Sequence, residues 1–176
     1  NINAGTLALS GSGVLSSSSK VTANGTLSIG GLASGASIQT LAGSGYVTLG
    51  SNTLTLTAAN DTFSGAISGT GGLTLTSGTE TLSGTNTFEG GITVNAGTLK
   101  VSADRNLGAV PGSADADALT LNGGTLQVTA DSTLASNRGI TLGSGGGIFS
   151  IDPTVTVNYA GVMAGTGGLT DRKSVV

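Results

Sequence analysis

Apolar and polar residues alternate along most of this chain in short runs that are separated by turn-forming residues. Within residues 82–101, the runs Ile92–Val94 and Thr98–Val101 flank the turn Asn95-Ala96-Gly97. Alternation with a period of two is typical of a strand with one buried face. Asparagine and glycine supply the positive φ angles with which a chain turns between strands. The pattern therefore predicts an all-β chain with no substantial helix.

The turn-and-strand pattern of residues 95–101 recurs in nearly the same letters elsewhere. A turn that contains glycine is followed by Thr-Leu, a variable residue and an apolar residue at four places, with turn glycines Gly5, Gly25, Gly97 and Gly124. The first and the last gap between these glycines are typical of a repeat protein with coils of roughly 20 to 27 residues. The long middle gap would hold several coils that match the pattern less well. We expect the four motifs to occupy equivalent positions in their coils.

A second motif alternates with the first. Residues 60–74 and residues 157–170 both contain an aromatic residue, then glycine, then a β-branched residue, and both end in Thr-Gly-Gly-Leu-Thr. Residues 86–92 carry a shorter version. Gly71 and Gly167 match in the two longer copies, and the distance between them along the chain corresponds to about four coils.

These repeats favour a parallel β-helix, a solenoid of seven or eight coils. One coil cannot bury its own apolar face, so neighbouring coils must stack to close the interior. A β-sandwich or an antiparallel barrel also has short strands and frequent turns. Two-residue Asn-Gly hairpin loops are few, however, and the recurrence of the same local sequence favours equivalent positions in a stack.

The extent of the repeats along the chain predicts the domain organisation. Residues 1–170 are interpreted as one β-helical repeat segment, an internal fragment of a larger protein, with one longer loop predicted at residues 106–117. Residues 171–176 hold three charged residues and depart from the pattern. They are interpreted as an atypical tail, either a frayed end or a sequencing scar, and are left out of the fold prediction.

Composition narrows the functional classes. The chain has 32 glycines among 176 residues, no cysteine, no histidine, 9% charged residues and a net charge of −3. Binding of nucleic acid through phosphate neutralisation needs a basic patch, which this charge balance does not supply. The sequence contains no run of about 18 apolar residues, so no transmembrane helix is predicted. The absence of histidine excludes ordinary Ser-His catalysis.

Carboxylates are the remaining candidates for site chemistry. Glu80 and Glu89 are the only glutamates, and Asp61 or Asp152 could lie beside them after coiling, as in a polysaccharide-cleaving enzyme. Scarce aromatic and basic residues argue against that role, and no enzyme activity is predicted. Hard cations take carboxylate oxygens, but Asp115-Ala116-Asp117 offers only two carboxylates, so a solvated loop is favoured. No catalytic residue, cofactor or metal ligand is assigned.

Three other features have structural explanations. The glycine string at residues 143–147 lacks the Lys-Ser/Thr pair of a phosphate-binding loop. An ice-binding face needs Thr-x-Thr in register on every coil, and most coils lack the runs seen in residues 53–57 and 73–76. Aromatic side chains are expected inside the stack or against its corners rather than on a ligand. These aromatic residues are Tyr46, Phe63, Phe88, Phe149 and Tyr159.

One stretch resembles a known family. Residues 70–74 read T-G-G-L-T, and residues 81–99 read T-L-S-G-T-N-T-F-E-G-G-I-T-V-N-A-G-T-L. This sequence is similar to the autotransporter-associated β-strand repeat of bacterial autotransporter passenger domains. The N-L-G of residues 106–108 and the L-T-L-N-G-G-T-L of residues 119–126 also resemble the family. The similarity is strong over residues 60–170 and looser before residue 60.

The resemblance implies a right-handed parallel β-helix that is displayed at the bacterial cell surface after export across the outer membrane. The partner that it implies is a C-terminal outer-membrane β-barrel of the parent protein, outside these 176 residues. In the family the repeat is linked to export and folding rather than to catalysis. Lack of cysteine fits this route, because a disulfide closed in the periplasm would obstruct passage of an unfolded chain.

The sequence therefore predicts a structural stalk that aids export and presents an adhesive or effector region. Two alternatives stay open. One is an adhesin segment that itself binds a host surface protein or glycan, and the other is a β-helical enzyme that acts on polysaccharides.

Overall fold

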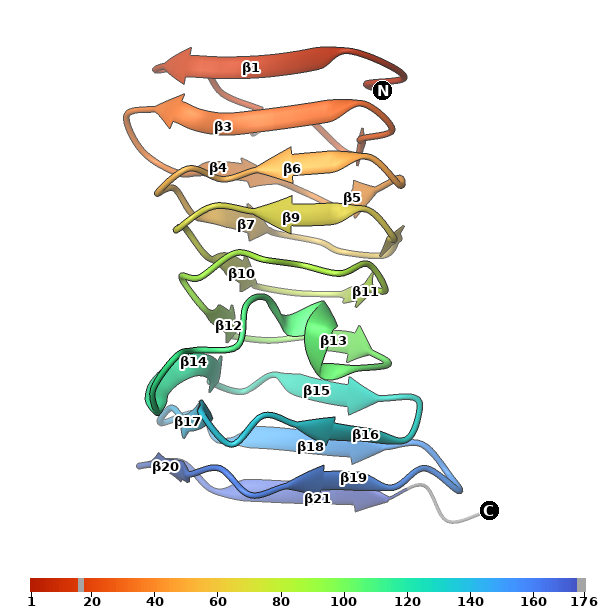
Figure 1. The fold of residues 1–176 in the computed structure, drawn as a ribbon, viewed down its shortest axis with the longest axis vertical. Helices are drawn as coiled ribbons and strands as arrows, with labels where there is room; N and C mark the ends of the chain where they lie inside the picture. Colours follow the sequence, from red (N-terminus) through yellow and green to blue (C-terminus); the bar gives the residue numbers. More distant parts are fainter. Residues whose placement is uncertain (16–17, 174–176) are drawn as a thin grey trace.

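A computed structural model of the protein describes residues 1–15 and 18–173, which form a parallel β-solenoid of about eight turns. In Figure 1 the chain descends from the first coil in red to the last in blue. Strands nearer the viewer, such as β3 (Thr26–Leu32), run to the left, whereas the fainter β4 (Ala36–Ile38) behind them runs to the right. This winding is right-handed, so the predicted right-handed parallel β-helix is confirmed.

Every strand pair is parallel, and the strands lie on three faces of the solenoid. The first face contains β1 (Thr6–Gly11), β3, β6 (Tyr46–Thr48) and β9 (Ala66–Ser68), and below them in Figure 1 the pair β16 (Ser132–Leu134) and β19 (Val157–Tyr159). The second face contains β4, β7 (Leu54–Leu56), β10 (Leu73–Leu75), β12 (Ile92–Val94), β14 (Asp115–Leu121), β17 (Arg138–Leu142) and β20 (Met163–Gly165).

The third face follows the second around each coil. It contains β8 (Thr62–Phe63), β11 (Thr79–Leu82), β13 (Thr98–Val101), β15 (Thr125–Val128), β18 (Gly147–Ile151) and β21 (Leu169–Lys173). Two short strands, β2 (Val21–Thr22) and β5 (Leu41–Ala42), pair with each other above β8, and Gly43 forms a bridge to Phe63.

The register places similar side chains above one another. On the second face Leu54 pairs with Leu73, Leu73 with Ile92, and Ile92 with Leu119. Because side chains of a strand alternate between its two faces, Leu54 and Leu56 point inward while Thr55 between them points outward. These inward columns join into one apolar core that runs along the stack. The burial of each large aliphatic side chain contributes roughly 1.5–3 kcal/mol.

Small residues at the corners let the coils approach each other closely. A Cβ atom at Gly65 would overlap the carbonyl oxygen of Gly45, in the coil above. The same holds one coil higher, where a Cβ atom at Gly45 would overlap the carbonyl oxygen of Gly25. Glycine is therefore required at this corner by backbone contact between coils, and the high glycine content has a direct structural cause.

The equivalence of the four turn motifs was predicted wrongly. Thr6 and Thr26, which follow the first two turn glycines, pair on the first face, whereas Thr98 and Thr125 pair on the third face. The motif thus marks a corner followed by an inward leucine without determining which corner. Leu7, in β1 at the start of the stack, is 40% exposed, since β1 has a partner strand on one side alone within the described residues.

The second repeated motif shows the same displacement. The apolar strand after its glycine is β9 on the first face in one copy and β20 on the second face in the other. The two copies are therefore offset by one face, although both end in the same six residues, Gly-Thr-Gly-Gly-Leu-Thr. Coils of unequal length cause this offset, because the chain reaches the same face after a different number of residues in different coils.

The longest coil contains the predicted insertion. Ile92 pairs with Leu73 of the preceding coil and with Leu119 of the following coil. The chain from Ile92 to Leu119 is longer than the chain from Leu73 to Ile92. The additional residues form a loop with the 3-10 helix η1 (Asp104–Leu107). The predicted loop of residues 106–117 is therefore displaced toward the N-terminus. The helix η1 begins at Asp104, before the predicted start, and strand β14 begins at Asp115, before the predicted end. Within the two described ranges, η1 is the only helix, and no helix there is long and apolar enough to cross a membrane.

The charged end of the chain continues the stack for three residues. Asp171, Arg172 and Lys173 belong to β21 and pair with Phe149, Ser150 and Ile151 of β18. Residues 174–176, the rest of the atypical tail, lie outside the described residues.

Candidate functional site

Two of the four predicted carboxylates are brought together. Thr81 of β11 pairs with Thr62 of β8, which places Asp61 next to Glu80 in the adjacent coil. Asp152 is on a later coil and accepts a hydrogen bond of 2.6 Å from Nε2 of Gln127. Glu89 is exposed beside the long loop and does not join the pair.

Glu80 occupies a position that apolar residues fill in the following coils. Glu80 pairs with Leu99, which pairs with Leu126, which pairs with Phe149, and all of these side chains point inward. The Glu80 side chain is completely buried. Its Oε2 accepts a long hydrogen bond of 3.5 Å from the Thr40 hydroxyl, and Oε1 has no partner.

Burial, followed by the repulsion of the Asp61 carboxylate, raises the pKa of Glu80 from the ordinary 4.5 to about 8. Weaker effects from a Leu41 backbone hydrogen bond, Thr40 and Lys20 oppose this rise. At neutral pH Glu80 is therefore mostly a neutral carboxylic acid. Because its oxygens are closed to solvent, a substrate cannot reach them, and this arrangement differs from an accessible pair of catalytic carboxylates.

Asp61 differs from Glu80 in having a cationic partner. The ammonium of Lys20, which precedes β2, forms an ion pair with Oδ1 of Asp61. The Lys20 side chain is about half exposed, and the Asp61 side chain is one-fifth exposed. Asp61 also lines a shallow surface groove together with Asn60, Thr62 and Thr79. Of the two carboxyl groups, Asp61 is therefore the one at the outer edge with a cationic partner.

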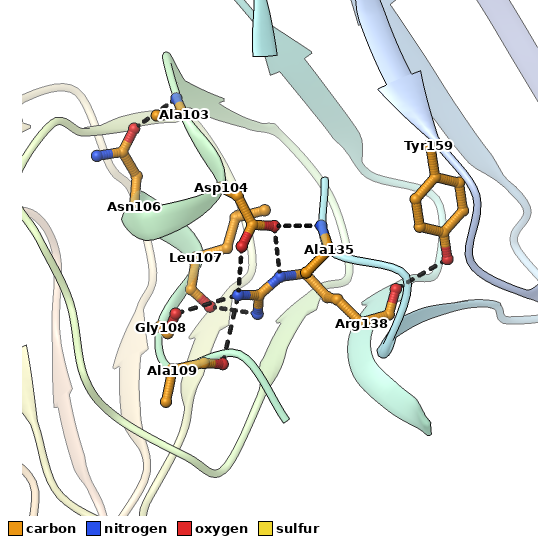
Figure 2. Close-up of polar contacts among 9 residues, drawn as sticks. All are labelled: Ala103, Asp104, Asn106, Leu107, Gly108, Ala109, Ala135, Arg138 and Tyr159. Carbon is orange, nitrogen blue, oxygen red and sulfur yellow. Dashed lines mark hydrogen bonds and ion pairs between the residues drawn. The ribbon is translucent and has the colours of Figure 1, made fainter. Parts of the chain in front are cut away.

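A second polar cluster fixes the long loop to the coil that follows it. Figure 2 shows the guanidinium of Arg138, the first residue of β17, against Asp104 of η1. Nε donates to Oδ1 of Asp104 at 3.0 Å, and Nη2 donates to Oδ2 at 3.2 Å. The remaining donors bind the backbone carbonyls of the loop, with Nη1 on Leu107 at 2.9 Å and Nη2 on Gly108 at 3.1 Å and Ala109 at 3.3 Å.

The Arg138 cluster is nearly closed to solvent. Arg138 is 1% exposed, and the hydroxyl of Tyr159, one coil further, donates to its backbone carbonyl at 2.8 Å. A buried arginine is stable only when its donors are satisfied, and here the loop backbone and one carboxylate satisfy them. The cluster therefore attaches the insertion to the start of β17 (Figure 2).

Two buried asparagines add hydrogen bonds between coils on the first face, where residues 83–90 form no strand. Asn86 accepts from the Ile67 amide at 2.9 Å and donates to the Asn106 carbonyl at 2.6 Å. Asn106 donates from its side chain to the Gly84 carbonyl at 2.8 Å. Sequence reasoning missed both asparagines and Arg138 as structural residues. The spacing of 20 residues between Asn86 and Asn106, one coil length, was the available signal.

The other candidate positions have local roles. Asp115 lies in β14, and its Oδ1 accepts a hydrogen bond of 3.0 Å from the Asp117 amide. The residues that the structure describes contain no group of three or more potential ligands that could hold a metal ion. On the second face Thr55, Thr74 and Thr93 form one outward column. The double row of an ice-binding face is incomplete, since the residue two positions after Thr93 is Asn95.

Most aromatic side chains lie inside the stack, as predicted. Phe63, Phe88 and Phe149 are buried in the core, and Tyr159 packs partly against it. The prediction was wrong for Tyr46, which is 63% exposed at the start of β6, where the side chain points outward.

One coil of the solenoid matches a known protein family. The model of the passenger-associated-transport-repeat matches residues 77–101. These residues include β11, β12 and β13, so the match begins just before a third-face strand and ends with the next strand on that face. It therefore covers one complete coil and confirms the resemblance to autotransporter passenger repeats there. Comparison with curated proteins and with solved structures gave no match.

Proposed function

We propose that this segment, which carries a passenger-associated transport repeat at residues 77–101, is part of the stalk of an exported surface protein. The observation that carries the proposal is the place of this coil in the solenoid. Its strands β11 and β12 pair in register with strands of the preceding and the following coil. The repeat is thus one layer of a continuous stack, and such a stack is suited to hold another region at a distance.

The geometry of the stack supports a role as a spacer. Each coil adds about 4.8 Å along the axis, the ordinary distance between hydrogen-bonded strands. The length of such a rod therefore depends on the number of coils, while its width stays constant. We propose no catalytic role for the segment, and the burial of Glu80 behind the surface supports this view.

An export role extends the proposal. The repeat family implies a secreted or surface-exposed protein, and the partner would be an outer-membrane barrel of the parent protein. The chain has no cysteine, so no disulfide can form before the chain crosses the membrane. Coils that stack one by one outside the membrane oppose backward sliding, because a folded coil is wider than an extended chain.

Two deletions of equal length test the export role in the full-length protein. Deletion of residues 79–97 joins Gly78 to Thr98 and removes one complete coil, since Thr79 and Thr98 occupy the same register position. Deletion of residues 54–72 also removes one complete coil but leaves the repeat intact, since Leu54 pairs with Leu73. Surface yield relative to total protein is measured by labelling intact cells.

The expected result is a several-fold loss of surface yield for the first deletion and a smaller loss for the second. Equal yields in both deletions and the parent would contradict a specific export role and leave a spacer. Binding of the purified segment to host extracellular matrix would contradict the passive stalk and favour the alternative in which this segment is itself an adhesin.

A further inference from the structure

The contact between the β8 coil and the β11 coil has fewer register pairs than the contacts that follow it on the third face. Strands β11 and β8 share two register pairs, Thr81 with Thr62 and Leu82 with Phe63. In contrast, β11 shares four register pairs with β13 on its other side. The buried carboxyl group of Glu80 lies at this shorter contact. A polar group without a full set of hydrogen bonds is therefore buried at the boundary between these two coils.

Only one of the two neighbouring carboxyl groups has an environment that accommodates a negative charge. Asp61 has the ammonium of Lys20 on Oδ1 and is partly open to solvent. Glu80 is completely buried, and its single side-chain partner is the distant Thr40 hydroxyl. On the other side, Lys100 lies at an outward position of β13, between the inward Leu99 and Val101. A charge on Glu80 would therefore be only weakly compensated, by the Leu41 backbone, Thr40 and Lys20.

We infer that the coil of residues 77–101 takes up one proton when it folds, so that Glu80 is built into the stack as a neutral carboxylic acid and its ionisation loosens the contact with the coil of β8. The Asp61 carboxylate, which is paired with Lys20, disfavours a second charge beside it. The inference is independent of the stalk proposal, since it concerns the stability of a coil and not the role of the rod. It makes this contact between coils sensitive to pH.

The direction of the pH effect follows from linkage. The pKa of Glu80 is raised in the folded state, so the folded coil binds the proton more tightly than the open coil does. The stabilisation is complete below the ordinary value of 4.5 and is lost as the pH rises through about 8. Opening of this contact therefore increases with pH over that window and becomes constant above it.

Carbon-13 NMR of the glutamate carboxyl groups tests the protonation directly. The chain has two glutamates, so selective labelling gives two carboxyl signals, and Glu80→Gln assigns them by removing one. We expect the Glu80 signal to keep the chemical shift of a protonated acid at pH 6 and to change with a midpoint near 8. A Glu80 signal that already has the shift of a carboxylate at pH 6 would overturn the inference.

Hydrogen exchange tests the loosening of the contact. The amides of Thr81 and Ser83 donate to the carbonyls of Asp61 and Phe63 across it, at 3.0 and 3.1 Å. Relative to Glu80→Gln, opening in the parent protein should rise roughly 50- to 100-fold between pH 5.5 and pH 7.5. The exposed Glu89→Gln is the matched control and should behave like the parent protein.

Two outcomes of the exchange experiment would overturn the inference. One is a parent profile that follows that of Glu80→Gln at every pH, which would mean that ionisation of Glu80 does not open the contact. The other is an equal rise with pH at the Thr98 amide, which donates to the Gly78 carbonyl on the opposite side of β11, because the effect would then not be specific to this contact. Asp61→Asn should move the midpoint of the effect to lower pH, since it removes the neighbouring negative charge.

Discussion

Replacement of Arg138 by methionine tests whether the long loop is fixed by the coil that follows it. Methionine keeps an unbranched side chain of similar reach but has no hydrogen-bond donor. The substitution therefore removes the bonds to Asp104 and to the carbonyls of Leu107, Gly108 and Ala109 without opening a large cavity. The backbone of β17, to which Arg138 belongs, is not otherwise altered.

The magnitude follows from the burial of the partners. Removing one member of a buried ion pair typically costs 3–5 kcal/mol, because the other member stays without compensation. Leu107 and Gly108 are buried, so their carbonyls would be left unsatisfied, at a cost of roughly 1–3 kcal/mol each. The Asp104 side chain is 15% exposed and can recover some hydration. This rehydration offsets part of these costs, and we expect a total destabilisation of at least about 4 kcal/mol.

Two measurements check this expectation. Chemical denaturation gives the free energy of unfolding, and hydrogen exchange of amides in the loop locates the effect, since solenoids can open locally. Arg105→Met is the matched control, because Arg105 is exposed in the same helix and should change stability by less than about 0.5 kcal/mol. A double-mutant cycle with Asp104→Asn should give a coupling energy above roughly 1.5 kcal/mol.

The reasoning would be refuted by a loss of less than about 1 kcal/mol together with unchanged exchange in the loop. That result would mean that the loop is held by other contacts, such as the bond from Nδ2 of Asn137 to the Pro111 carbonyl at 3.0 Å. A loss of unfolding free energy of the expected size, together with a uniform increase in hydrogen exchange along the stack, would instead mean that Arg138 stabilises the whole stack rather than the loop.

Two further substitutions test the close contact between coils and the buried acid. Gly65→Ala should lower the unfolding free energy by more than about 1 kcal/mol, since its Cβ atom would overlap the Gly45 carbonyl, whereas Gly112→Ala, with open space around it, should change it by less than about 0.5 kcal/mol. Equal effects in thermal denaturation would contradict this account of corner glycines. The parent protein should lose about 2–3 kcal/mol of stability between pH 5 and pH 7 through Glu80, and Glu80→Leu should not show this loss. Parallel pH profiles of the two proteins would contradict it.

The sequence by itself determined the type of fold. Short alternating runs such as Ile92–Val94, the turn glycines and the repeated motifs predicted a parallel solenoid, and the structure confirms it. The reason is that these signals are local. Alternation determines which side chains of a strand share a face, and Asn and Gly determine where the chain turns. The core positions Leu27, Leu99 and Leu126 could be read in this way.

Only the tertiary structure decided which face each motif occupies and which polar residues meet. Coils of unequal length shift the faces relative to the sequence, so nearly identical motifs that lead into Thr26 and Thr98 lie on different sheets. The neighbours of Asp61 and Arg138 depend on the summed lengths of all intervening turns. Contacts between coils are set by register, and register is a property of the assembled stack rather than of any local stretch of sequence.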